Sequence, residues 1–264
     1  MIKHLSIRSI IAALAALFII SSAKADMPTL WLIGDSTVQV GTRGQQGWGT
    51  ALPQFFNTEK IKIENRARGG RSSRTFLTEG LWEKVREQIK PGDYLMMQFG
   101  HNDASPINED PPVTRSTRAR GTIRNNSDET KDIINVLTGK RETVHSYGWY
   151  LKQFVTEGKA AGAQVIVISP IPKRGFVNGS ARRGGGGYAS LAKEVAEQNQ
   201  VNFIDLSSLV ADKYNEMGEA ASKALFNDSV HTTPEGAKLN ASCVVEGIRS
   251  LSDCNLKNYL LETK

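Results

Sequence analysis

Apolar residues are concentrated in five short runs along the chain, and each run is bounded by Gly, Asp, Asn or Pro. Runs of this length between turn-forming residues are typical of buried parallel strands. The pattern predicts strands at Leu30–Ile33, Ile61–Glu64, Tyr94–Phe99, Val165–Ser169 and Val201–Ile204.

Helical spacing of apolar residues occurs between and after these runs. It predicts helices at Leu81–Ile89, Tyr147–Ala161, Tyr188–Asn199, Leu206–Met217 and Pro234–Leu251. Strands that alternate with helices require a parallel sheet with both faces covered. The sequence therefore predicts an α/β fold, a three-layer α/β/α sandwich around a five-stranded parallel sheet.

Two segments interrupt the alternation. Residues 104–143 carry three prolines and four closely spaced arginines, with little apolar periodicity. We expect a long irregular excursion there, near the carboxyl edge of the sheet, and loops of this length are often functional. Residues 173–187 include Arg182, Arg183 and four consecutive glycines, and they predict a second irregular piece.

The first 25 residues have the pattern of an export signal. Lys3 and Arg8 precede an apolar run from Ile10 to Ile20, which ends in Ala23-Lys24-Ala25. The run has 11 residues, whereas a membrane-spanning helix needs roughly 20. The pattern predicts a cleaved signal peptide over residues 1–25. We therefore expect an exported protein, periplasmic or secreted, without a stable membrane anchor.

The remaining residues, 26–264, fit one α/β domain better than two small ones. Removal of Lys3, Arg8 and Lys24 lowers the net charge from +6 to +3. A charge this small makes nucleic acid a poor partner. The two cysteines, Cys243 and Cys254, are too few for a metal site, and two readings stay open: a disulfide in an exported chain, or two unpaired side chains.

Polar segments follow the predicted strands at the sheet edge where ligands bind in open parallel sheets. Ser36 is the third residue after the first predicted strand, and Asp228 and His231 precede the last predicted helix. A serine hydroxyl becomes a nucleophile when an imidazole accepts its proton, and a carboxylate must orient that imidazole. Taken alone, each segment is better explained by turn or helix-cap chemistry.

Two further segments, 65–75 and 100–103, can supply hydrogen-bond donors. Acyl transfer develops negative charge on the carbonyl oxygen, which backbone N–H groups of a glycine turn and an asparagine amide stabilise. The alternative readings are a solvated basic loop for residues 65–75 and a strand-end turn for residues 100–103.

Taken together, Gly34-Asp35-Ser36, the glycine of 65–75, Gly100-His101-Asn102-Asp103 and Asp228-x-x-His231 resemble the four sequence blocks of the SGNH (GDSL-type) hydrolases. The resemblance implies a flavodoxin-like SGNH fold. It also implies Ser36 as nucleophile, His231 as base and Asp228 as its orienting partner, and an oxyanion hole made by the Ser36 N–H, Gly70 and Asn102. Gly70 is preferred to Gly69 because it directly precedes Arg71-Ser72.

Within this superfamily the chain is most similar to the rhamnogalacturonan acetylesterases. The likeness rests on Gly47-Trp48-Gly49, the segment 69–74, Glu142-Thr143-Val144-His145-Ser146 and Ser169-Pro170-Ile171-Pro172. It implies hydrolysis of acetyl esters on a pectin-derived or related polysaccharide or oligosaccharide, without a metal or organic cofactor. The excursion at 104–143 and the segment 182–187 are less typical of that family and leave the exact polymer open.

Several residues are candidates for substrate contact. Trp48 can stack on a sugar ring or be buried behind the nucleophile, and His101 and His145 can line the groove. An arginine set can pair with uronate carboxylates or form a solvated basic face; it comprises Arg71, Arg74, Arg115, Arg118 and Arg120.

Other functions remain as alternatives. An SGNH esterase for acetylated xylan or other oligosaccharides shares all of these features. A lipid esterase, lysophospholipase or thioesterase requires an apolar groove or lid, but residues 104–143 are polar and basic. A non-catalytic carbohydrate-binding protein on the same scaffold is expected to have lost a site residue, and none is missing.

Overall fold

The computed structural model describes residues 27–39, 41–109 and 118–262. The predicted signal peptide and Arg115 therefore lie outside the described residues. Within the described ranges, no helix is both long enough and apolar enough to cross a membrane.

The central sheet has five strands in the order β2-β1-β3-β6-β9, and every neighbouring pair is parallel. Leu30 lies opposite Ile63 on one side and Tyr94 on the other, so the strand order reverses at β1. This is the flavodoxin-like order. All five predicted strands are confirmed, as β1 Thr29–Gly34, β2 Lys62–Asn65, β3 Tyr94–Gln98, β6 Gln164–Ile168 and β9 Asn202–Ile204.

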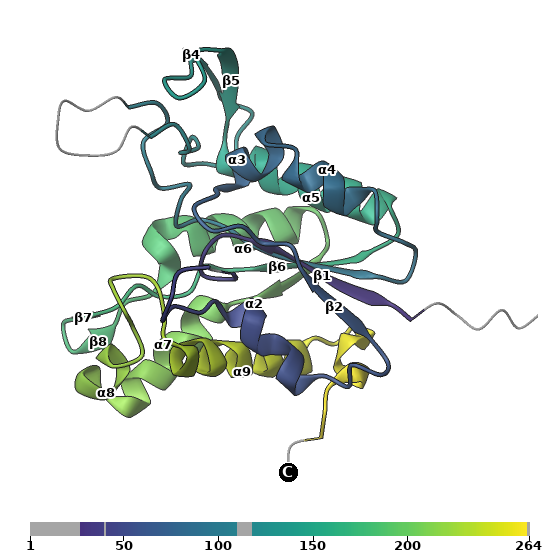
Figure 1. Ribbon diagram of the computed structural model, residues 1–264, viewed down its shortest axis with the longest axis vertical. Coiled ribbons are helices and arrows are strands. Elements are labelled where there is room, and N and C mark those ends of the chain that lie inside the picture. The colour runs from purple at the N-terminus through teal and green to yellow at the C-terminus, as the bar shows by residue number, and fades with distance from the viewer. Residues whose placement is uncertain (1–26, 40, 110–117, 263–264) are drawn as a thin grey trace, which may run out of the picture.

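Helices cover both faces of this sheet, which confirms the three-layer prediction (Figure 1). Successive side chains of a strand point to opposite faces. Leu30 and Leu32 of β1 accordingly pack against α2 (Trp48–Ala51), α7 (Leu206–Met217) and α9 (Pro234–Ser250). Trp31 and Ile33 pack toward α3 (Ser73–Thr78), α4 (Leu81–Arg86), α5 (Tyr147–Ala160) and α6 (Tyr188–Gln198). The short elements are η2 Leu52–Phe55, α8 Glu219–Lys223 and η4 Asn255–Tyr259.

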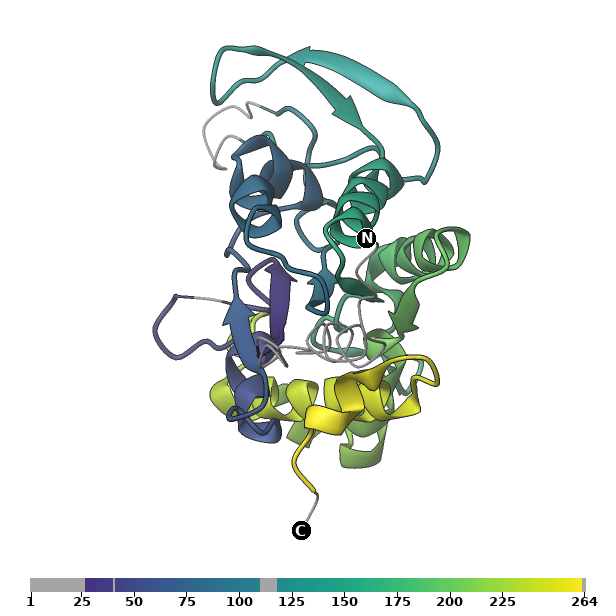
Figure 2. The same cartoon turned by 90° about the vertical axis from the view of Figure 1, so that its right-hand side faces the viewer.

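The excursion at 104–143 is less irregular than the sequence predicts. Its second half forms an antiparallel hairpin of β4 (Thr130–Ile134) and β5 (Arg141–His145), which pair with each other as a sheet of their own. In both views the hairpin extends beyond the helices at one end of the molecule (Figures 1 and 2). Most of its side chains are exposed, so it lacks the apolar run that would have predicted a strand.

Arg74 fastens this excursion to the body of the protein. The side chain is fully buried, and its Nε and Nη2 donate to the two carboxylate oxygens of Glu142 at 2.7 and 2.9 Å. Nη1 donates to the carbonyl oxygens of Ile107 and Gly121. Arg74 therefore has a structural role, and the interpretation that it pairs with a uronate carboxylate is wrong.

The glycine-rich segment at 173–187 also contains local structure. A second, two-residue hairpin pairs β7 (Phe176–Val177) with β8 (Ser180–Ala181), and η3 (Gly184–Gly187) follows it. All four glycines of η3 have positive φ, a conformation that side chains with a Cβ atom rarely adopt. This explains why four glycines occur in a row.

The two cysteines are not bonded to each other. Cys243 in α9 and Cys254 just before η4 are both free and buried. The Sγ of Cys254 lies 3.7 Å from Oε1 of Gln164, the first residue of β6. The structure therefore agrees with the interpretation that both cysteines are unpaired side chains in the core, and it contains no disulfide between them.

Candidate active site

Ser36, His231 and Asp228 form one hydrogen-bonded line at the carboxyl edge of the sheet. Oγ of Ser36 lies 2.8 Å from Nε2 of His231, and Nδ1 of the same ring lies 2.7 Å from Oδ2 of Asp228. Ser36 follows β1, the strand at which the order reverses. The structure therefore brings these three predicted residues together at the position where ligands bind in folds of this type.

Asp228 is held as an anion by its hydrogen bonds. Partial burial acts to raise its pKa, but donors from His231 and from the Val230 backbone outweigh this and lower the pKa to about 2. Oδ1 accepts the backbone N–H groups of Val230 and His231, both at 2.7 Å. Oδ2 is left to accept from the ring, which fixes the orientation of the imidazole.

The loop that carries His231 is tied to the loop that follows Ser36. The N–H of Gln46 donates to the carbonyl oxygen of Thr232 at 2.9 Å, and the Thr232 hydroxyl donates back to the Gln46 carbonyl at 2.8 Å. Beyond it, Thr233 caps α9 by accepting from the N–H of Gly236, with Pro234 in the first turn. The cap confirms the predicted start of the helix. The contacts between the two loops hold His231 in position next to Ser36.

A buried polar network supports the turn that carries Ser36. Oδ1 of Asp35 accepts from the backbone and hydroxyl of Thr37, at 2.8 and 2.7 Å. The Thr37 hydroxyl accepts from the Gln98 amide, and Gln98 in turn accepts from Nε1 of Trp48 at 2.8 Å. Gly34 permits this turn, because a Cβ there would lie 2.5 Å from the Gln98 carbonyl oxygen.

This network corrects the stacking role considered for Trp48. The indole is fully buried, so it belongs to the core and cannot contact a sugar. Gln98 and Thr37 are supporting residues that the sequence interpretation missed. The available signal was a glutamine within an otherwise apolar strand, because buried polar side chains are normally hydrogen-bonded.

The two donor loops lie beside Ser36. Gly70 has a φ of +78°, which favours glycine, and a Cβ on the preceding Gly69 would lie 3.7 Å from the Ser36 Cβ. Asn102 is mostly buried, and its amide donates one proton to the carbonyl oxygen of Arg71 at 3.0 Å. The amide has a second proton, for which no hydrogen-bond partner is found among the described residues.

Asp103 links the 65–75 segment to the 100–103 turn. Its carboxylate accepts the backbone N–H of Ser73 at 3.1 Å and also the Ser73 hydroxyl, across the gap between the segment after β2 and the turn after β3. Burial raises the pKa of Asp103 to about 7, although the Ser73 hydrogen bonds oppose the shift. Asp103 belongs to the block Gly100-His101-Asn102-Asp103, but the sequence of that block does not predict this role.

His101 and His145 lie in different surroundings. The Nε2 atom of His101 is buried without a hydrogen-bond partner among the described residues. Burial lowers the pKa of His101; Asp35 opposes this shift, and the proximity of Lys173 and His231 adds to it. His101 is therefore part of the same cluster as His231. The ring of His145 instead stacks on Trp149, at 3.8 Å between centroids, and no contact with Ser36 or His231 is found for it in the described ranges.

The surface around Ser36 is hollowed on both sides of the glycine pair. Gly69 lines a cavity of about 380 Å³ together with Gln39 and Arg68. Gly70 lines another, of about 370 Å³, together with Arg71 and Arg120. Both linings combine arginine side chains with apolar surface. Within the described part of the chain, no group of three or more His, Cys, Asp or Glu residues could hold a metal ion.

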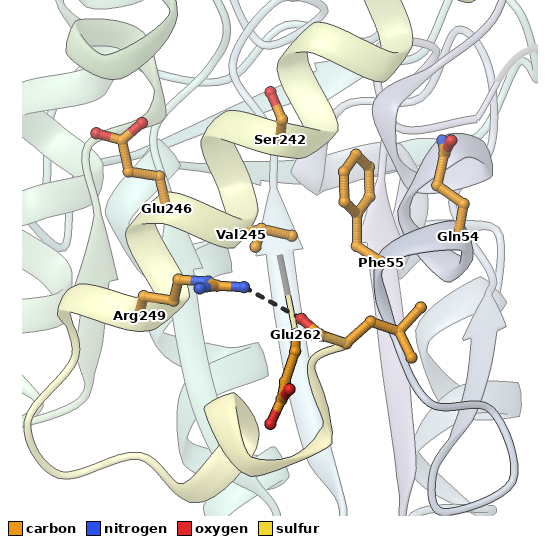
Figure 3. Close-up of a pocket in the computed structure, with 8 residues that line it drawn as sticks. Gln54, Phe55, Ser242, Val245, Glu246, Arg249 and Glu262 are labelled. Atoms are coloured by element: carbon orange, nitrogen blue, oxygen red, sulfur yellow. Dashed lines mark hydrogen bonds between the residues drawn. The ribbon is translucent and has the colours of Figure 1, made fainter. Parts of the chain in front are cut away.

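A larger and more apolar cavity, of about 610 Å³, lies elsewhere. Figure 3 shows Ser242, Val245 and Arg249 on the second half of α9, facing Phe55 of η2. Arg249 donates to the carbonyl oxygen of Leu261 at 3.2 Å. The lining shares no residue with the loops around Ser36, so this cavity is not part of the site.

Comparison with known proteins places this site in a family. Residues 32–239 match the model of the GDSL-like lipase/acylhydrolase family. The chain is 32% identical over 230 residues to a probable rhamnogalacturonan acetylesterase of Bacillus subtilis, which covers 84% of this chain and 93% of that protein. It is 27% identical to a rhamnogalacturonan acetylesterase of Emericella nidulans, covering 89% and 90% of the two chains.

Solved structures agree at the level of the fold. The Bacillus subtilis protein YxiM superposes with a TM-score of 0.67 and 25% identity, over 84% of this chain and 56% of that one, so this chain spans about half of its length. An acetylxylan esterase from Geobacillus stearothermophilus gives a TM-score of 0.56 with 20% identity, over 83% and 93%. The chain belongs to the GDSL-like lipase/acylhydrolase family and is a carboxylic ester hydrolase of the SGNH type, related to the rhamnogalacturonan acetylesterases.

Proposed function

We propose that the protein removes acetyl groups from an acetylated pectic polysaccharide, most specifically rhamnogalacturonan, with Ser36, His231 and Asp228 as its catalytic triad. The observation that carries this proposal is the continuous line from Ser36 Oγ to His231 (2.8 Å) and on to Asp228 (2.7 Å). Nucleophile, base and orienting acid lie within hydrogen-bond reach of one another, which is the requirement for acyl transfer through serine.

In the first half of the reaction, Ser36 Oγ attacks the acetyl carbonyl carbon while Nε2 of His231 takes the hydroxyl proton. The negative charge that develops on the carbonyl oxygen is accepted by the N–H groups of Ser36 and Gly70 and by the Asn102 amide. The bond to the sugar oxygen then breaks, and His231 returns the proton to that oxygen. An acetyl ester on Ser36 remains.

In the second half, a water molecule attacks this acetyl ester and gives its proton to His231. The tetrahedral centre collapses, acetate leaves, and the proton returns to Ser36 Oγ. Asp228 remains ionised throughout and stabilises the imidazolium that forms twice in each cycle. The pKa of about 2 for Asp228 is consistent with this role at any pH above that value.

The choice of substrate rests on the relatives and on the surroundings of Ser36. Two curated relatives are named rhamnogalacturonan acetylesterases, and arginines line the cavity beside Gly70. A lipid esterase would need an apolar surface at the nucleophile, but the large apolar cavity shares no residues with the loops around Ser36. Acetylated xylan, a neutral polymer, is the alternative that the experiment below must separate.

Acetate release from a substrate panel tests the proposal. The panel comprises acetylated rhamnogalacturonan, acetylated xylan and a short-chain acyl lipid, and we expect the first to give the highest kcat/KM. Ser36→Ala should abolish release without unfolding the protein, because no core volume is lost. Ser242→Ala, on the exposed side of α9, is the matched control and should retain full activity. Turnover of the lipid alone would refute the polysaccharide assignment, and unchanged turnover by Ser36→Ala would refute the triad.

A further inference from the structure

Three arginines gather at the cavity beside Gly70. The cavity has a volume of about 370 Å³, and its lining comprises Gly70, Arg71, Thr75, Glu79, Arg118, Ala119, Arg120 and Leu137. Gly70 is the proposed oxyanion donor, and its neighbour Gly69 lies against Ser36. The cavity is therefore within reach of the sugar units next to the one whose acetyl group is attacked.

The positive charge of this cavity is only partly compensated. Nε of Arg71 lies 2.9 Å from Oε2 of Glu79, whereas Arg118 and Arg120 have no acidic partner in the described part of the chain. Burial and the nearby charges of Arg118 and Arg71 lower the pKa of Arg120, and the negative charge of Asp35 opposes this shift only in part. An anion placed between these side chains would relieve that repulsion.

Arg120 is also held in one position. Its Nη1 donates to the carbonyl oxygen of Gly70 at 3.0 Å, and its Nε donates to the Ser105 hydroxyl at 3.2 Å. A guanidinium that is already fixed loses little conformational freedom when it binds a carboxylate. Arg120 thus connects the cavity to the peptide of the proposed oxyanion glycine.

The hairpin adds an apolar side chain to the lining. Leu137, at the tip between β4 and β5, is 59% exposed and faces this cavity. The tip is fixed because Asn108 accepts from the Val136 N–H and donates to the Ile134 carbonyl, both at 2.9 Å. An apolar side chain in the same lining as cationic groups suits a sugar unit that carries one carboxylate and an otherwise apolar ring face.

We infer that this cavity is a subsite for the carboxylate of a uronic acid unit that is covalently linked to the acetylated sugar. The inference rests on the proposed function and names the group that makes an acidic polymer preferable to a neutral one. Charge-assisted hydrogen bonds from arginine to carboxylate provide the affinity. Arg118 acts on the acidic unit alone, whereas Arg120 also positions the Gly70 peptide.

Arg118→Gln provides the test. We compare kcat/KM for an acetylated oligosaccharide that contains galacturonate with kcat/KM for acetylated xylo-oligosaccharide, which is neutral. The ratio of the two values should fall about tenfold, as expected for loss of one hydrogen bond to a charged group, and the change should be in KM. Arg86→Gln removes the same charge from the exposed surface of α4 and should leave the ratio unchanged.

Inhibition gives a second readout that does not depend on acetylated polymer. Trigalacturonate should inhibit hydrolysis of p-nitrophenyl acetate more strongly than xylotriose does, and Arg118→Gln should remove the difference. Equal ratios in wild type and Arg118→Gln, or equal inhibition by the two trisaccharides, would overturn the subsite. Failure to release acetate from either oligosaccharide would instead reject the proposed function, so the two failures are distinguishable.

Discussion

At the scale of single residues, Asp228 performs two tasks with one carboxylate. Oδ1 accepts two backbone N–H groups of its own turn, and Oδ2 accepts the ring of His231. The turn is thereby closed by the same side chain that orients the proposed base. A spacing of three residues is short enough for both contacts, which is why the sequence could offer the pair as a candidate, although its role was assigned only with the other three blocks.

Asp228→Asn should therefore lower kcat by about 10³- to 10⁴-fold, because an amide at this position no longer enforces the imidazole tautomer. The rate with p-nitrophenyl acetate and circular dichroism of the same sample would separate chemistry from folding. Asp212→Asn, which affects only the surface pair with Arg183, is the control. A wild-type rate in Asp228→Asn would mean that another acid orients His231.

Other residue roles could not be predicted in this way. The partner of Trp48 is Gln98, 50 positions along the chain, and nothing in the sequence near Trp48 distinguishes a buried indole from a sugar platform. The same applies to Arg74, whose partner Glu142 is 68 positions away. Local pattern predicts which groups can react, but the contacts that bury them are set by the tertiary fold.

At the scale of elements, the strands were predictable and the hairpin was not. Central strands of a covered sheet are buried on both faces, as β3 is along its whole length, and they appear in the sequence as apolar runs. In β4 only Ile133 is buried, because the hairpin is attached mainly through Glu142 and not through a core of its own. Helix α3, of six residues, is too short to show a helical period.

The loops after β2 and β3 are joined by Asp103 and Ser73, and the burial of Asp103 should make stability depend on pH. Because the folded-state pKa of Asp103 is raised to about 7 from an ordinary value of 3.8, its contribution is fully present below about pH 4 and is lost as the pH rises through 7. The contribution is on the order of a few kcal/mol for a fully buried group.

Urea unfolding between pH 4 and 8 measures this dependence. Asp103→Asn, which keeps an acceptor for Ser73 but cannot ionise, should flatten the decline in the free energy of unfolding over that range. Asp253→Asn, at an exposed position, is the control and should show the wild-type slope. Parallel curves for wild type and Asp103→Asn would contradict the assignment of the raised pKa.

At the scale of the whole molecule, the proposed site is assembled from the two ends of the chain. Ser36 and His231 are 195 positions apart, and they meet only when β1 lies in the sheet and α9 packs across it. The sequence predicted that Ser36 and His231 lie close together, because each block follows a predicted strand or precedes a helix and the carboxyl ends of parallel strands share one edge of the sheet. The distances within the site had to come from the structure.

We also propose that the protein is exported and that its mature form begins at Asp26. The basis is the charged start, the apolar run to Ile20 and the Ala23-Lys24-Ala25 ending. Sequencing the amino terminus of protein recovered from the periplasm or medium of an expressing bacterium should give Asp26 as the first residue. Recovery of chains that begin at Met1, with the membrane fraction, would refute cleavage.

The separate hairpin has a consequence for how such an enzyme can diversify. Among the strands described, β4 and β5 hydrogen-bond only to each other, and Arg74 anchors β5 through Glu142. The tip of the hairpin can therefore change in length or in its side chains while the register of the central sheet is preserved. Under the proposed subsite, contacts from the hairpin tip to the polymer can therefore change during evolution while the loops that carry Ser36 and His231 stay as they are.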